Sequence, residues 1–109
     1  MSTLSTHVLD AASGTPAVGV RVTLASLDGA CRELGSGSTD ADGRLSGLAP
    51  DGLAPGRYRL TFDTGGYHRR TGQEGFFPEV VVCFQVGAER HYHVPLLLSP
   101  YAYSTYRGS

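Results

Sequence analysis

Two histidines stand close together near the end of the chain, at His91 and His93 in the segment HYHVP. In a strand this spacing puts both imidazoles on one face and Tyr92 on the other. An imidazole titrates near neutrality, so such a pair suits proton transfer or metal binding. The simplest interpretation, however, is a pair of half-exposed strand histidines. A metal site needs a third ligand, and His7, His68 and the scattered carboxylates show no recognised spacing, so we expect no metal.

Two further basic residues lie beside turns. His7 comes shortly before the turn-forming segment SGTPAVG, and Arg44 follows DADG, whose aspartates are suited to bind nearby backbone amides. Taken singly, a histidine in a strand is usually structural, and an arginine after a turn is usually a solvated charge. Such turns nevertheless aim the residues beside them, so both residues are candidates for a site.

The chain ends on Tyr106, Arg107, Gly108 and Ser109. Terminal segments are usually poorly ordered unless something ties them down. An aromatic residue and an arginine in this place indicate a segment with a partner. The last four residues are therefore candidates as well.

The elements that must hold these residues have the pattern of short strands. Glycine or proline interrupts the chain about every ten residues, with apolar and β-branched runs between. This pattern predicts one all-β domain over residues 1–109, a sandwich of antiparallel strands. The predicted strands are 7–9, 18–27, 32–38, 44–47, 56–63, 79–86, 90–98 and 101–106.

Alternation predicts which strand faces are buried. Apolar residues occupy every second position from Val18 to Leu24 and from Tyr58 to Phe62, so we expect one face of each strand to be buried. Residues 64–75 lack this alternation. We expect one short helix there, after Thr64, whose hydroxyl is suited to cap it.

Three leucines in a row, Leu96, Leu97 and Leu98, follow Pro95 and cannot all point inward from a sheet with one wet face. Something must cover the second face, either another sheet layer of the same chain or a partner subunit. A proline inside the run fits an edge position or a bulge. The sequence leaves both questions open, although the small size of the chain favours a subunit.

Composition excludes several classes of function. The net charge of -1 provides no basic field for nucleic acid, and no apolar run approaches the ~20 residues of a membrane-spanning helix. The first residues lack the basic and apolar regions of a secretory signal, so the cytoplasm is the expected location. Cys31 and Cys83 are expected to be free structural thiols, with Cys83 buried. The partner is expected to be a small molecule or another protein.

Both ends of the chain resemble one protein superfamily. HVLDAASGTPAVGV is similar to the N-terminal signature of the transthyretin superfamily, and FFPEVVVCFQV with HYHVPLLLSPYAYSTYRGS is similar to its last three strands. The ending YRGS resembles the hallmark of one branch, the 5-hydroxyisourate hydrolases of purine breakdown, and hormone-carrying transthyretins lack it. The two signatures lie at opposite ends at the expected separation, which makes the resemblance specific.

The resemblance implies a transthyretin-like β-sandwich of two four-stranded antiparallel sheets with one short helix. It also implies a homotetramer with active sites between subunits, and no cofactor or metal. Carried over by position, the catalytic residues fall on His7, His93 and Ser109. The substrate-binding residues fall on His7, Arg44, Tyr106 and Arg107. His91 is expected either to flank the substrate or to lie behind the residues that contact it, because the resemblance supports His93 more strongly.

The implied reaction is hydrolysis of an amide-like ring bond of 5-hydroxyisourate, which opens the six-membered ring to 2-oxo-4-hydroxy-4-carboxy-5-ureidoimidazoline. Water addition to a carbonyl needs a base, a donor for the oxyanion and a proton for the leaving nitrogen. His7 and His93 would form the acid–base pair, in an order that the sequence leaves open. The guanidinium fork of Arg44 would bind the oxygen-rich heterocycle. A nucleophilic role for Ser109 is disfavoured, because the sequence has no G-x-S-x-G elbow and no identified third member of a triad.

Two other functions remain open from the sequence. A transthyretin-like carrier of a hydrophobic hormone would have the same fold, but its channel should be more apolar than one lined by two histidines and an arginine. A plain adhesion or structural sandwich would leave the C-terminal tetrapeptide unexplained.

Overall fold

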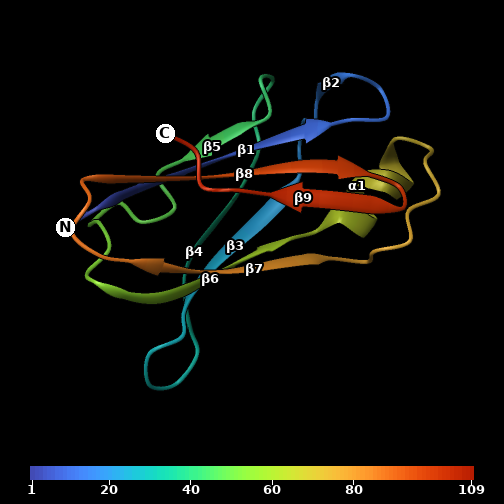
Figure 1. Cartoon of the computed structure of the whole chain (residues 1–109). Helices are drawn as coiled ribbons and strands as arrows, with labels where there is room; N and C mark the ends of the chain where they lie inside the picture. Colours follow the sequence, from blue (N-terminus) through green and yellow to red (C-terminus); the bar gives the residue numbers. More distant parts are fainter.

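The computed structural model describes residues 1–109 as two β-sheets packed face to face, with one short helix (Figure 1). The strands are β1 (Thr3–Asp10), β2 (Thr15–Pro16), β3 (Arg21–Ser26), β4 (Arg32–Ser38), β5 (Arg44–Ser46), β6 (Gly56–Phe62), β7 (Val80–Val86), β8 (His91–Ser99) and β9 (Ala102–Thr105), and the helix is α1 (Thr64–Arg70). Every predicted strand is present, and only the short β2 is additional.

The first sheet has the strand order β2-β1-β8-β9, and β5 also pairs with β1. The second sheet has the order β4-β3-β6-β7. The predicted two-sheet sandwich with one helix is confirmed, with two differences of detail. β5 makes the first sheet five-stranded, because the chain returns after β4 to the free edge of β1. In addition, β1 and β8 run parallel, and most of the chain lies between them, which provides the long connection that parallel neighbours need.

The core lies between the two sheets, where alternate residues of the strands meet. The predicted burial of Tyr58, Leu60 and Phe62 is confirmed. The expectation for Val18 is wrong, since this residue is 45% exposed. Gly19 takes a φ of +75°, which interrupts the extended run, so β3 begins only at Arg21.

Helix α1 begins where it is expected, but its cap is different. The carboxylate of Asp63 accepts a hydrogen bond from the backbone N–H of Gly66 at 3.0 Å. The Thr64 hydroxyl instead donates to the carbonyl oxygen of Phe77 at 2.9 Å, so the prediction that it caps the helix is wrong. Asp63 and Thr64 are both competent caps, and the one that stands just before the first helical turn takes the role.

Strand β8 lies between β1 and β9, so an edge position for Pro95 is wrong. Pairing with β9 begins at Leu96 and ends at Ser99, and the chain next returns to β8 at a bridge between His93 and Gly108. Pro95 therefore stands in the gap between the β9 ladder and this bridge, where no strand pairing requires its missing N–H donor. Leu96 and Leu98 are fully buried between the sheets and only Leu97 is half-buried on the outer face, so the second sheet covers most of the leucine run.

Both cysteines are free, and both are exposed. Burial of Cys83 is wrong, because Val82 and Phe84 point toward the core and alternation sends the thiol outward. None of the helical structure has the length and apolar character needed to cross a membrane.

Candidate active site

Most of the candidate site residues lie together on the outer face of the first sheet. His7 of β1 lies directly opposite Arg44 of β5, and Ser5 of β1 lies beside His93 of β8. The neighbours of these residues along β1 and β8 are buried, so the residues themselves point away from the second sheet. We call Ser5, His7, Arg44, His91 and His93 the histidine face.

A tight turn places Arg44 on this face. The carboxylate of Asp40 accepts hydrogen bonds from the backbone N–H groups of Asp42 and Arg44, each at 2.9 Å. These two bonds, the one from Arg44 first, hold the pKa of Asp40 below its usual value, and the positive charges of Arg44 and His7 add to the effect. Gly43 takes a φ of +75° with its Cα against the β1 backbone, where a side chain would collide. The turn chemistry therefore aims Arg44, as expected from the sequence.

His93 is held by Ser5 and kept neutral by its surroundings. Its Nδ1 lies 2.7 Å from the Ser5 hydroxyl. Partial burial lowers the pKa of His93 below the ordinary value of 6.5, and the nearby Arg44 guanidinium lowers it further. His7 and His91 act in the same direction. At neutral pH one ring nitrogen of His93 is therefore unprotonated and able to accept a proton.

His7 is fixed by the same turn that places Arg44. Its Nε2 lies 2.9 Å from the carbonyl oxygen of Asp42. A carbonyl only accepts, so Nε2–H of His7 donates this bond and Nδ1 is the nitrogen that remains for other partners. The orientation of the ring is thereby tied to the backbone of the turn.

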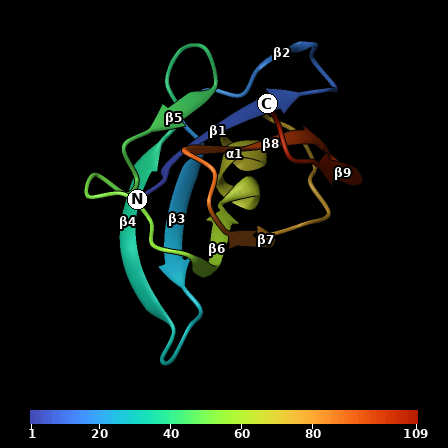
Figure 2. The same ribbon diagram turned by 60° about the vertical axis from the view of Figure 1, so that its left-hand side comes forward.

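The C-terminal segment docks beside His93. The backbone N–H of Gly108 donates to the carbonyl oxygen of His93 at 2.8 Å. A Cβ on Gly108 would lie 2.5 Å from Cδ2 of His93, so only glycine allows this approach. Figure 2 shows the C-terminus on the side of β1 and β8 that faces away from the second sheet. The terminal tetrapeptide is thus tied down next to the histidine face.

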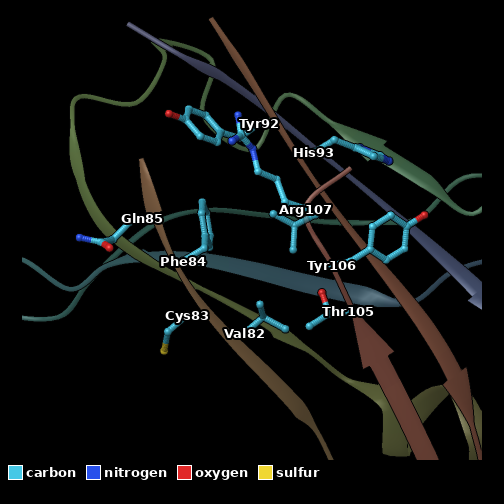
Figure 3. Close-up of a pocket in the computed structure, with 10 residues that line it drawn as sticks. Val82, Cys83, Phe84, Gln85, Tyr92, His93, Thr105, Tyr106 and Arg107 are labelled. Carbon is cyan, nitrogen blue, oxygen red and sulfur yellow. The ribbon is translucent and has the colours of Figure 1, made fainter. Parts of the chain in front are cut away.

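Arg107 points in a different direction. Its guanidinium lies 5.2 Å from the centre of the Tyr92 ring, and 3.8 Å from a carboxylate oxygen of Glu89. It lines a cavity of about 300 Å³ between β7 and β8, together with Phe84 and Tyr92. In Figure 3 the His93 ring points away from this cavity, while Arg107 reaches toward Tyr92. His93 also lines this cavity, so the cavity adjoins the histidine face, although the imidazole is directed out of it.

The structure thus brings His7, Arg44, His91 and His93 together on one face. The tail residues lie at the border of this face and not within the group. Tyr106 is exposed, Arg107 is turned away and Ser109 is the exposed terminal residue next to the docked Gly108. No three His, Cys, Asp or Glu side chains form a group that could hold a metal ion.

Sequence reasoning misses Ser5 as a member of the site. It stands two residues before His7, so alternation along β1 puts both on one face. That it touches His93, however, follows from the parallel pairing of β1 with β8, which no local pattern in the sequence reveals.

Comparison with known proteins agrees with these observations. A family model described as HIUase/Transthyretin family matches residues 4–108. The chain is 50% identical over 113 residues to the 5-hydroxyisourate hydrolase of Mus musculus, covering 99% of this chain and 96% of that protein. Among solved structures, Klebsiella pneumoniae 5-hydroxyisourate hydrolase is similar with a TM-score of 0.92 and 44% identity, covering 100% of both chains. Sea bream transthyretin in complex with thyroxine is similar with a TM-score of 0.89 and 35% identity, covering 96% of this chain and 93% of that one. The chain therefore belongs to the HIUase/Transthyretin family.

Proposed function

We propose that this chain hydrolyses 5-hydroxyisourate to 2-oxo-4-hydroxy-4-carboxy-5-ureidoimidazoline in the degradation of urate. The observation that carries the proposal is the histidine face, where His7, Arg44 and His93 from three strands come together beside the docked C-terminus. The identity of 50% to the Mus musculus enzyme, over nearly the whole of both chains, supports the same activity.

His93 acts as the base in this mechanism. Its ring is neutral near pH 7 and its Nδ1 is engaged with Ser5, so Nε2 is the nitrogen that takes a proton from the attacking water. The water oxygen adds to the ring carbonyl and the C–N bond then breaks. His7, held on the neighbouring strand by Asp42, supplies the proton for the leaving nitrogen.

Arg44 binds the substrate and stabilises the negative charge that develops on the carbonyl oxygen. Its guanidinium has no carboxylate partner, in contrast to Arg57 and Arg107. A planar fork of donors matches the oxygen-rich edge of the heterocycle and stays charged at every working pH. The N–H donors of the Arg44 guanidinium are therefore available to bind the substrate.

The C-terminal tail supplies the remaining contacts. Tyr106 lines the site, and Ser109 provides hydrogen bonds to the substrate from its place next to the docked Gly108. Arg107 reaches the substrate only when its side chain leaves Tyr92 and Glu89. His91 lies next to His93 on the same face of β8, at the side of the bound substrate.

A homotetramer with sites between subunits is part of the proposal. The histidine face is open to solvent in the single chain, and a site for hydrolysis benefits from walls that restrict water to the reacting molecule. A second subunit over this face would provide such a wall and would cover the half-buried Leu97. Light scattering coupled to gel filtration measures the mass of the assembly directly. A monomer at the concentration of the activity assay would contradict the proposed homotetramer. A cytoplasmic location stays a prediction.

The test is the decay of ultraviolet absorbance of 5-hydroxyisourate, generated freshly from urate by uricase. The protein is expected to accelerate the decay well beyond the spontaneous rate. A folded protein that gives no acceleration would contradict the proposal.

The alternative is a carrier of a small ligand, since sea bream transthyretin in complex with thyroxine has a similar fold. Three imidazoles and a free guanidinium make the face of this chain polar, which disfavours an apolar hormone. Thermal shift with thyroxine and with a urate analogue distinguishes the two functions. Stabilisation by the urate analogue alone is expected, and stabilisation by thyroxine alone would favour the carrier.

A further inference from the structure

Three short distances link four side chains in a row across β1 and β8. Thr3 Oγ1 lies 2.5 Å from His91 Nδ1, and His91 Nε2 lies 2.9 Å from Ser5 Oγ. Ser5 Oγ in turn lies 2.7 Å from His93 Nδ1. The parallel register explains the row, since Thr3 lies beside His91 and Ser5 lies beside His93. Both ring nitrogens of the exposed His91 are thus engaged by hydroxyls, and the row runs from solvent to the base.

The Ser5 hydroxyl couples the protonation states of the two histidines. It has one proton to donate, and it contacts a ring nitrogen of His91 and a ring nitrogen of His93. If it donates to one nitrogen, the other nitrogen must carry a proton and donate to the hydroxyl oxygen. Only two arrangements of neutral rings therefore satisfy the row.

One of these arrangements makes His93 a base. When Ser5 donates to His91, Nδ1–H of His93 donates to Ser5, and Nε2 of His93 carries a lone pair toward the outer face. His91 then bears its proton on Nδ1 and donates to Thr3, whose hydroxyl lies 3.4 Å from the carbonyl oxygen of Arg90 and can donate there. Every group in this arrangement except Nε2 of His93 has a partner.

We propose that Thr3, His91, Ser5 and His93 form a proton relay, in which Ser5 fixes the tautomer of His93 and His91 passes the proton from the attacking water to solvent. This inference rests on the proposed function and deepens it. It assigns His91 to proton transfer rather than to substrate contact, and it gives Ser5 a positioning role.

The relay balances the protons of the reaction. Nε2 of His93 takes a proton from water, while Nδ1–H passes to Ser5 Oγ and the Ser5 proton passes to Nε2 of His91. His93 is then neutral again with its proton on Nε2, and His91 is charged and releases its Nδ1 proton through Thr3 to solvent. Opening an amide-type ring produces a carboxylic acid that ionises at neutral pH, so each turnover has one proton to release. To return to the first arrangement, Nδ1 of His91 takes up a proton from solvent, its Nε2 proton passes back through Ser5 to Nδ1 of His93, and Nε2 of His93 gives up the proton that came from water. His7 takes up one proton in place of the one that it gave to the leaving nitrogen, so the net release is the single proton of the carboxylic acid.

The charges around His93 favour outward transfer. Arg44 from β5, His7 from β1 and His91 from β8 all disfavour a positive charge on its ring. From the C-terminal segment, the uncharged Gly108 lies against the His93 ring, while the Arg107 guanidinium lies over the Tyr92 ring. A proton gained by His93 is therefore held weakly, and the row of hydrogen bonds leads from it to His91, which is exposed to solvent.

Variants of Ser5 and His91 test the relay by steady-state kinetics in dilute buffer. Ser5→Ala is expected to lower kcat about 10- to 100-fold with little change in KM, the loss typical when the partner that orients a functional imidazole is removed. Ser5→Thr retains the hydroxyl and is expected to recover most of the activity. The matched control is Ser46→Ala, since Ser46 lies opposite Ser5 on β5 but makes no hydrogen bond to an imidazole. Full activity in Ser5→Ala, or equal losses in Ser5→Ala and Ser46→Ala, would overturn the proposal.

His91→Ala separates proton transfer from packing. This variant is expected to lose kcat and to regain it as imidazole is added to the buffer, because a small mobile base replaces the missing relay member. A purely structural role would not respond to added imidazole. His91→Ala with unchanged kcat, or with a loss that imidazole does not restore, would contradict the relay. This variant tests the relay even if Ser5→Ala fails to fold.

Nitrogen NMR of the histidine side chains in the wild-type protein tests the row without any substrate. Near pH 7.5 we expect a proton on Nδ1 of His93 and on Nδ1 of His91, with Nε2 of His93 bare. A proton on Nε2 of His93 would overturn the proposed arrangement. If the wild-type protein proves inactive on 5-hydroxyisourate, the proposed function fails, while this spectrum still shows whether the hydrogen-bonded row exists.

Discussion

The outer faces of the two sheets use arginine in opposite ways. On the second sheet Arg57 forms an ion pair with Asp28 at 3.1 Å, and Arg59 donates to the Cys31 sulfur at 3.1 Å. The guanidinium groups of Arg57 and Arg59 are thus each bound to a neighbour of the same chain. On the first sheet the Arg44 side chain has no such partner, although its backbone N–H is held by a turn. The unpaired guanidinium of Arg44 is consistent with the proposed role of this face in binding substrate.

The histidines show the same contrast between the surface and the core. His7, His91 and His93 are each held through ring nitrogens by a hydroxyl or a carbonyl. His68 on α1 is 1% exposed, packed against Gly75, and neither of its ring nitrogens has a hydrogen-bond partner. An imidazole that is buried without partners fills space, whereas one that is oriented at the surface is available for proton transfer.

Exchange of arginine for lysine is expected to show the largest difference in activity between the two sheets. Arg44→Lys keeps the charge but loses the fork of donors, so kcat/KM on 5-hydroxyisourate is expected to fall about 100-fold, the worth of roughly two charge-assisted hydrogen bonds. Arg59→Lys on the other sheet is the matched control and is expected to leave kcat/KM unchanged. Full activity in Arg44→Lys would show that charge alone is sufficient.

A side chain at Gly108 should weaken the docking of the tail. In Gly108→Ala the new Cβ would lie 2.5 Å from the His93 ring, so ring or tail must move, and kcat/KM is expected to fall about 10-fold with an unchanged melting temperature. Gly87→Ala is the control, because its Cβ would lie at an ordinary 3.6 Å from the Tyr92 hydroxyl. Equal activities of the two variants would exclude a role for the tail in positioning His93.

Titration of His93 by NMR sharpens the electrostatic part of the comparison. The pKa of His93 is lowered by burial and then by Arg44, so the neutral base persists below pH 6.5 and kcat/KM falls only as the pH drops through the lowered value. Arg44→Gln removes one cause, so the pKa of His93 should rise and the acid limb of the activity should move to higher pH. Arg59→Gln should leave the titration in place. A pKa that does not move in Arg44→Gln would contradict the assigned cause.

Replacement of the buried histidine should affect stability and not activity. His68→Leu removes two unpaired ring nitrogens from the core and improves the helix propensity of α1, so we expect a gain of about 1 kcal/mol and a rise in Tm of roughly 4–8 °C by calorimetry. Activity should be unchanged. A lower Tm would show that the imidazole makes an interaction that stabilises the folded state.

The sequence predicts the strands well because their signal is local. Alternation and turn residues place β3, β6 and the turn before Arg44, and the resemblance at the two ends selects the sandwich. Errors occur where two neighbours compete for one role, as Asp63 and Thr64 do for the helix cap. Another error concerns Cys83, which is expected to be buried because its neighbours are apolar but is exposed.

The site is less predictable, because its contacts join distant parts of the chain. The pairing of β1 with β8 brings Ser5 to His93, and no local pattern encodes a parallel pairing of the two ends. The direction of Arg107 depends on where Tyr92 and Glu89 lie, which the sequence of the tail does not contain. The types of the site residues can be predicted from sequence, but their partners require the fold.

The most direct test of the account is the rate of 5-hydroxyisourate decay with the wild-type protein, His93→Gln and Arg59→Gln, at equal concentrations and corrected for spontaneous hydrolysis. We expect His93→Gln to lose about 10²- to 10⁴-fold in kcat/KM, the range typical of general acid–base groups, while Arg59→Gln matches the wild type. A His93→Gln protein within a few-fold of wild type would show that the histidine face does not supply the base.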